Sequence, residues 1–234
     1  MPFSEEELTK RMDDLGENIE KYVSEANNSG RPDSPARHFH IATISRMRTI
    51  GLENIFDDTL YFEYLYATLT AWGMDSRGAK LKGFEKFFRN IRSARDQIMK
   101  LKIYSLASLA EQEAETYVKV VHDIWQVILT MDIAQGKSQL VTGSKTLHHL
   151  LPDLVPPIDR EYTLKFFFDR KTITKNVEAD FVQVLTNYTY IYGLSEESIQ
   201  GIVGNNPLNT SVTKVIDNAI IGCRPKGKRS MWTT

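Results

Sequence analysis

The sequence contains a single cysteine, Cys223, among its 234 residues. One cysteine cannot form an internal disulfide, and it cannot supply the several thiolates of an iron–sulfur cluster or a cysteine-rich zinc site. No apolar run reaches the roughly 18–20 residues that cross a bilayer, and the acidic first residues lack the apolar core of a secretory signal. These absences lead us to expect a cytoplasmic protein with no membrane partner and no cofactor.

Several catalytic signatures are also missing. The sequence holds no P-loop, no G-x-G-x-x-G dinucleotide fingerprint, no G-x-S-x-G nucleophile elbow and no H-E-x-x-H zinc motif. The adjacent His148 and His149 would point about 100° apart on a helix, which does not suit two ligands of one metal ion. We therefore predict no metal site and expect this pair to pack in the interior, with His149 as a candidate for the lining of a pocket.

An excess of charge of one sign is absent overall, because 29 lysines and arginines face 30 acidic residues. With 41% hydrophobic and 25% charged residues, the composition excludes a disordered or fibrous chain. The basic residues nevertheless concentrate in residues 77–102, which hold only two acidic residues: the bases are Arg77, Lys80, Lys82, Lys86, Arg89, Arg92, Arg95, Lys100 and Lys102. This segment predicts either a positive surface for nucleic-acid phosphates or the solvated face of an amphipathic helix.

Strand-like alternation is missing, and apolar residues recur at helical spacing along most of the chain. Ser4 and Glu7 form a capping-box pattern at the start of the first helix. We predict an all-α fold without a linker between domains, so that residues 1–234 form a single compact unit. The expected helices cover about residues 4–25, 36–50, 80–100, 107–132 (buried at the centre), 176–192, 195–203 and 210–221, with others beginning near residue 57 and on either side of a proline-rich elbow that ends at Asp159.

Two short stretches carry residues with recognisable chemistry. Gly143-Ser144-Lys145-Thr146 is typical of a helix start after a glycine, where free backbone amides and the helix dipole can hold a phosphate. Lys145 in that first turn is a candidate amine nucleophile, and Asp159 follows fourteen residues later, after two prolines. The alternative interpretation is that Lys145 is simply solvated and that Asp159 is only a helix N-cap.

These stretches resemble the helix-hairpin-helix DNA glycosylases. In that family a hairpin of the form L-P-G-V-G-x-K-T-A opens one helix and V-D-T-H-V opens the next, and residues 140–146 (LVTGSKT) and 157–162 (PIDREY) are similar to them. Residues 67–75 (ATLTAWGMD) are similar to the family's L-L-S-x-Q-x-T-D stretch. The chain departs from the pattern at Val141, which stands where the hairpin has its first glycine.

The resemblance implies a two-lobed helical DNA glycosylase-like fold with a helix-hairpin-helix-like element. A middle lobe of about residues 57–170 would face a second lobe of residues 1–56 and 171–234, with the extruded base in the cleft between them. Asp159 would be the catalytic carboxylate and Lys145 the candidate nucleophile. The implied DNA contacts are Gly143, Ser144, Thr146, Arg77, Lys80 and Arg160, and the implied base pocket or wedge consists of Trp72, Met74, Tyr66 and His149. Core packing is the alternative role for these aromatic residues.

The function that the resemblance implies is excision of a damaged or modified base from DNA, in base repair or in defence against phage DNA. A carboxylate beside the sugar would stabilise the positive charge that develops when the N-glycosidic bond breaks. If Lys145 reaches the anomeric carbon, the enzyme would also cleave the strand through a covalent imine. The alternatives are a non-catalytic helical module that binds nucleic acid or a protein, and an enzyme that acts on RNA. We expect a monomer whose partner is DNA.

Overall fold

In the described part of the chain, the regular secondary-structure elements are all helices. The computed structural model describes residues 3–30, 32, 34–75, 80–136 and 139–223, and within them it has thirteen helices and no strand, which confirms the all-α prediction. The helices are α1 (Glu5–Glu17), α2 (Ile19–Asn27), α3 (Ser34–Ile50), α4 (Leu52–Ile55), α5 (Thr59–Ala71), α6 (Phe84–Ser93), α7 (Arg95–Leu101), α8 (Leu106–Ala110), α9 (Ala114–Met131), α10 (Leu140–Leu150), α11 (Thr163–Phe168), α12 (Val177–Ile202) and α13 (Val212–Gly222).

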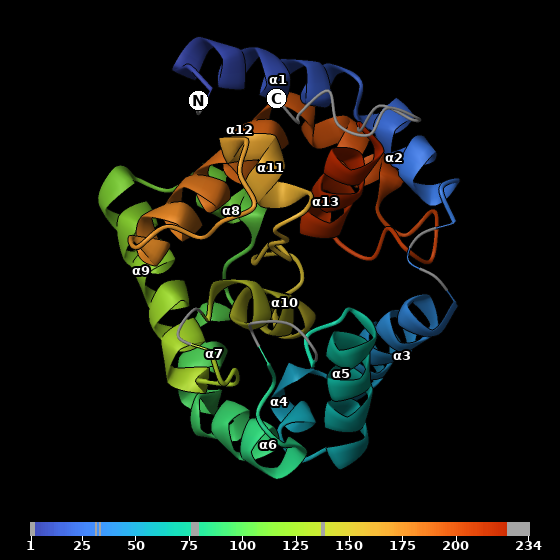
Figure 1. The fold of residues 1–234 in the computed structure, drawn as a ribbon, viewed down its shortest axis with the longest axis vertical. Coiled ribbons are helices and arrows are strands. Elements are labelled where there is room, and N and C mark those ends of the chain that lie inside the picture. Colours follow the sequence, from blue (N-terminus) through green and yellow to red (C-terminus); the bar gives the residue numbers. More distant parts are fainter. Residues whose placement is uncertain (1–2, 31, 33, 76–79, 137–138, 224–234) are drawn as a thin grey trace.

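Helices from the two ends of the chain lie together at one end of the molecule (Figure 1), where α2 packs on α13 and α1 packs on α12. The approach of α2 to α13 requires the glycine at position 222, because a Cβ there would overlap the carbonyl oxygen of Tyr22. Helices α3 to α7 form the opposite end, α9 runs along one side, and α10 lies between the two groups. Since α3 packs chiefly on α5, the boundary expected near residue 57 does not separate these groups.

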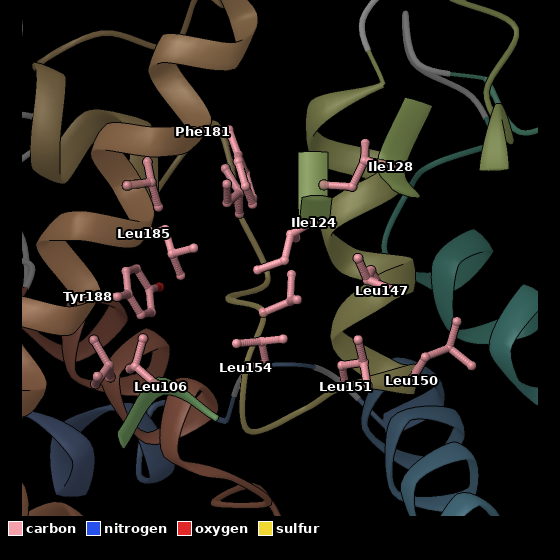
Figure 2. Close-up of a cluster of buried hydrophobic side chains, with 14 of the residues drawn as sticks. Leu106, Ile124, Ile128, Leu147, Leu150, Leu151, Leu154, Phe181, Leu185 and Tyr188 are labelled. Atoms are coloured by element: carbon pink, nitrogen blue, oxygen red, sulfur yellow. The ribbon is translucent and has the colours of Figure 1, made fainter. Parts of the chain in front are cut away.

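The central core lies where α9, α10 and α12 meet (Figure 2). Ile124 and Ile128 of α9 face Leu147 of α10, and Phe181 of α12 closes the cluster from the other side. A Cβ added to Gly143 would lie 2.5 Å from the Cγ2 atom of Ile128, so the glycine allows α10 to pack closely on α9. All eleven residues of α10 are buried. The remaining labelled members of the cluster are Leu106, Leu150, Leu151, Leu154, Leu185 and Tyr188.

Several helix boundaries differ from the prediction. The expected helix over residues 4–25 is divided at Asn18, and the one over residues 80–100 begins at Phe84 and is divided at Ala94. The helix expected to begin at Asp159 begins at Thr163, after a turn. Apolar spacing could not show these breaks, because the helices on both sides of each break bury residues in the same core.

The central buried helix is α10 rather than the segment 107–132. That segment forms two helices, α8 and α9, and α9 has an exposed face on which Val118 is 65% accessible. Some of the apolar residues of α9 therefore lie outside the core. In the same way, the expected separation of residues 176–192 and 195–203 is reduced to a kink at Ser195 inside α12.

Candidate active site

The elbow between α10 and α11 places Asp159. The side chain of Ser144 accepts a hydrogen bond from the backbone amide of Ile158 at 3.2 Å, which ties the elbow to α10. One carboxylate oxygen of Asp159, Oδ1, accepts hydrogen bonds from the amides of Glu161 and Tyr162 at 2.7 and 3.2 Å. The other oxygen, Oδ2, is directed towards the side chain of a lysine on α10.

That lysine is Lys145, and its Nζ atom donates to Oδ2 of Asp159 at 2.8 Å. The lysine is only 6% exposed, and its ammonium also lies 5.3 Å from the centre of the Trp72 ring. The two residues selected from the sequence for their chemistry are therefore in direct contact. An ammonium held between a carboxylate and an indole face is stabilised by both neighbours.

The carboxyl of Asp159 is held in its ionised form. Burial alone would raise its pKa, but the charge of Lys145, the hydrogen bond from Lys145 and the two backbone amides together lower the pKa below its ordinary value. A carboxylate in this state can stabilise a positive charge or accept a proton from a water molecule.

Lys145 and Asp159 line a cavity of about 480 Å³, a volume within the range of small-molecule sites. The cavity lies between α2 and α13 on one side and α3, α5 and α10 on the other, so it is formed by both groups of helices. Its lining combines apolar and charged groups: Ala26, Asn27, Pro32, Ala36, His40, Ala71, Trp72, Lys145, Pro157, Asp159, Tyr162, Leu208, Lys214, Asp217, Asn218 and Ile221.

A second ion pair faces the same cavity from α13. Nζ of Lys214 donates to Oδ2 of Asp217, and both residues are buried. Burial raises the pKa of Asp217, Lys214 partly offsets that rise, and the negative charge of Asp159 adds to it. This pair was not predicted from the sequence. A lysine and an aspartate three positions apart in a mostly apolar helix could have indicated a buried ion pair.

Three buried histidines lie close to the pair of Lys145 and Asp159. Nδ1 of His149 lies 2.7 Å from the carbonyl oxygen of Lys145, and Nε2 of His149 lies 3.0 Å from Nδ1 of His40. Nδ1 of His148 lies 2.9 Å from the carbonyl oxygen of Val155. Burial lowers the pKa of all three imidazoles, that of His149 to about 4. His40 lines the cavity and was not predicted from the sequence as a site residue. The two histidines at positions 38 and 40 were a signal that could have drawn attention to this helix.

The residues expected to form the pocket or wedge divide into two sets. Trp72 lines the cavity, and His149 supports it with ring centroids 5.3 Å apart. Met74 is buried in the core, which does not suit a wedge that must reach into a duplex. The hydroxyl of Tyr66 donates to the carbonyl of Lys82 at 3.1 Å, so this side chain packs away from the cavity.

The residues around Lys145 that were expected to contact phosphate lie in the interior of the structure. Ser144 and Thr146 are fully buried, and Gly143 is enclosed by Ile128. The three residues lie inside α10 rather than in a hairpin before it, because that helix already begins at Leu140. In this structure the three residues take part in packing, and their contact with DNA stays a prediction.

The remaining predicted DNA contacts lie on the surface or outside the described residues. Lys80 and Arg160 are exposed, and Arg160 donates to the carbonyl of Lys171 at 2.9 Å. Arg77 lies outside the described residues. Four other bases of the 77–102 segment form ion pairs with acidic residues: Lys82 with Asp132, Arg92 and Arg95 with Asp57, and Lys102 with Glu53.

No protein-family model, curated protein or solved structure gives a significant match to this chain. The interpretation of the site therefore rests on its own geometry. Within the described part of the chain, no helix combines the length and the apolar character that crossing a bilayer requires. In the same residues there is no group of three or more histidine, cysteine or acidic side chains arranged to hold a metal ion.

Proposed function

We propose that this protein is a DNA glycosylase that excises a damaged or modified base, acting as a monomer. The observation that carries the proposal is the contact between Lys145 and Asp159, at 2.8 Å, on the wall of a cavity of about 480 Å³. The two groups that the chemistry needs, an ionised carboxylate and an amine, thus lie together where a small molecule fits.

The carboxylate of Asp159 acts on the sugar. As the bond between the anomeric carbon and the base nitrogen breaks, its electron pair leaves with the base, which takes up a proton, and positive charge develops on the sugar. Asp159 stabilises this charge at close range from the wall of the cavity. A water molecule then bonds to the anomeric carbon, and its proton passes to the carboxylate.

Lys145 offers a second route to base release. Its ammonium gives a proton to Asp159, and the free amine bonds to the anomeric carbon as the bond to the base breaks and the base leaves with the electron pair and a proton. The bond between the anomeric carbon and the ring oxygen then breaks, a proton of the amine passes to that oxygen, which stays on the sugar as a hydroxyl, and an imine joins enzyme and sugar. This route makes the enzyme an abasic-site lyase as well as a glycosylase. If the covalent route does not operate, Lys145 acts through its positive charge, which keeps Asp159 ionised.

The two-lobed arrangement expected of a glycosylase is supported by the place of the cavity between the terminal helices and the middle helices. A base that leaves the duplex would enter it beside the indole of Trp72, which offers a flat apolar face. The exposed Lys80, Lys86 and Arg89 supply positive charge for the phosphate backbone.

A non-catalytic binding module is the second candidate, and one observation favours it. The Oδ1 atom of Asp159 accepts from the amides of Glu161 and Tyr162, as an aspartate does when its task is to order a turn. The cavity and the buried ion pairs would then serve a bound ligand or the fold alone.

The distinguishing experiment measures base release. The protein is incubated with DNA that carries a panel of altered bases, including heavily modified phage DNA, and abasic sites are counted. We expect Asp159→Asn to abolish release while DNA binding is retained, because the amide keeps its hydrogen bonds but carries no charge.

Asp58→Asn is the matched control. Asp58 also accepts from a backbone amide, that of Tyr61 at 2.8 Å, and pairs with Arg46, but it lies outside the cavity. This variant should release base at the rate of the unchanged protein. Release by Asp159→Asn would remove the catalytic assignment, and no release from any substrate by the unchanged protein would favour the binding module.

A further inference from the structure

Two buried hydrogen-bond acceptors on the cavity wall have no partner among the described residues. They are Nε2 of His40, on α3, and Oδ1 of Asn27, at the end of α2. His40 is 1% exposed, and its Nε2 atom has no hydrogen-bond partner among the described residues. A buried acceptor without a donor is unfavourable, and a bound molecule can remove that cost by supplying the donor.

The hydrogen-bond chain behind the cavity determines which form of His40 is present. A carbonyl oxygen can only accept, so Nδ1 of His149 carries the proton that binds the carbonyl of Lys145. The neutral His149 then offers Nε2 as an acceptor, and Nδ1 of His40 must donate to it. In the neutral His40 this leaves a lone pair on Nε2 and no proton.

The same series of hydrogen bonds connects Nε2 of His40 to Lys145. It runs from Nε2 of His40 through the ring of His149 to the backbone of Lys145, and the ring of His40 lies 5.5 Å from that of Trp72. A planar molecule in the cavity would lie in a space lined by Trp72, His40 and Lys145.

We propose that His40 determines specificity, because its Nε2 atom accepts a hydrogen bond from an amino group on the edge of the extruded base. This inference rests on the proposed function and adds to it the chemical class of base. A base with a donor at that edge would satisfy the nitrogen, whereas a base with only acceptors there would leave it unpaired and face a second lone pair. Asn27 supplies another acceptor for a second donor.

The test uses pairs of free bases that differ by one amino group: adenine with purine, and cytosine with pyrimidin-2-one. Binding is followed at millimolar base by the ¹⁵N resonances of the histidine side chains in the unchanged protein. We expect the amino-bearing member of a pair to bind roughly tenfold more tightly or better, with a shift of the Nε2 resonance of His40. Equal binding of both members, or binding that leaves this resonance unmoved, overturns the inference, as does the absence of any response to all four bases.

His40→Phe keeps a ring of similar shape but removes the acceptor, and it should reduce the ratio of affinities to near one. His38→Ala, on an exposed residue of the same helix, should keep the ratio. An unchanged ratio in His40→Phe would also overturn the inference. Failure of this inference and failure of the proposed function can be told apart. Base release that depends on Asp159 would still support the proposed function if His40 does not recognise the amino group.

Discussion

At the scale of single residues, the contact between Lys145 and Asp159 bears on stability and, under the proposed function, on chemistry as well. The ammonium of Lys145 is buried, and removing the carboxylate of Asp159 would leave it without its charged partner. Breaking a buried pair in this way typically costs about 3–5 kcal/mol. A loss of activity in a variant of either residue is therefore informative only when the variant is shown to be folded.

The covalent route is tested at one lysine. Lys145→Gln should prevent borohydride from trapping a complex between protein and DNA, because the amine that forms the imine is gone. Lys214→Gln is the control, since Lys214 lines the same cavity and is also buried in an ion pair. Trapping is measured as a DNA adduct on a denaturing gel.

Two results would change the assignment. If the unchanged protein yields no adduct on any substrate whose base it releases, the lyase route is wrong and water is the nucleophile. If only Lys214→Gln abolishes the adduct, the nucleophile is on α13 rather than on α10.

At the scale of elements, α10 determines where the site lies, and its position depends on a small residue. Gly143→Ala places a Cβ 2.5 Å from Ile128. Overpacking of this kind costs about 1–3 kcal/mol, so the free energy of unfolding in urea should fall by that amount. Gly193→Ala, on α12, adds a Cβ with no neighbour within 4 Å and should leave stability unchanged or raise it. An unaltered stability in Gly143→Ala would mean that α10 is not closely packed on α9.

The basic segment carries less available charge than its composition suggests. Arg92, Arg95 and Lys102 hold α6 and α7 to acidic residues near α4, so they have a structural role. In the described residues, no ion pair joins Lys80 or Lys86 to an acidic group. These are the better candidates for phosphate contacts.

The double variant Lys80→Glu and Lys86→Glu should weaken DNA binding and flatten its dependence on salt. Each lost phosphate contact lowers the slope of log affinity against log salt by about 0.9. Lys119→Glu, on the exposed part of α9, serves as the control for net charge. A salt slope that stays the same in the double variant would place the DNA on another surface.

At the scale of the whole molecule, three neutral histidines sit between the terminal and the middle helices. His40, His148 and His149 are all fully enclosed, and burial lowers their pKa values. In the unfolded chain a histidine has a pKa of about 6.5. Below that pH the unfolded state binds more protons than the folded state, so acid favours unfolding.

We therefore expect stability to fall as the pH is lowered from 7.5 towards 4. For His149, whose folded pKa is about 4, the free energy of unfolding should be roughly 2 kcal/mol smaller at pH 5 than at pH 7.5. Urea denaturation at both pH values measures the change. A stability that is equal at the two pH values would show that burial does not lower the pKa values of these histidines.

The sequence by itself determined those features that depend on a few neighbouring residues. Helical periodicity indicated the all-α class, and the capping box of Ser4 and Glu7 is present, with hydrogen bonds of 2.8 and 3.2 Å. Lys145 and Asp159 could be selected together because they are only fourteen positions apart, with Pro156 and Pro157 shortly before the aspartate, and the two side chains are in contact.

The tertiary structure alone decided the rest. His40, Lys214 and Asp217 join the site from segments more than 50 residues away from the elbow in the sequence, and no local pattern indicates that they meet. Burial of Ser144 and Thr146 likewise depends on how α10 packs between its neighbours. Hydrogen bonding within a helix is local, whereas a cavity is the space left by the packing of helices that are distant in the chain, so only the folded molecule defines it.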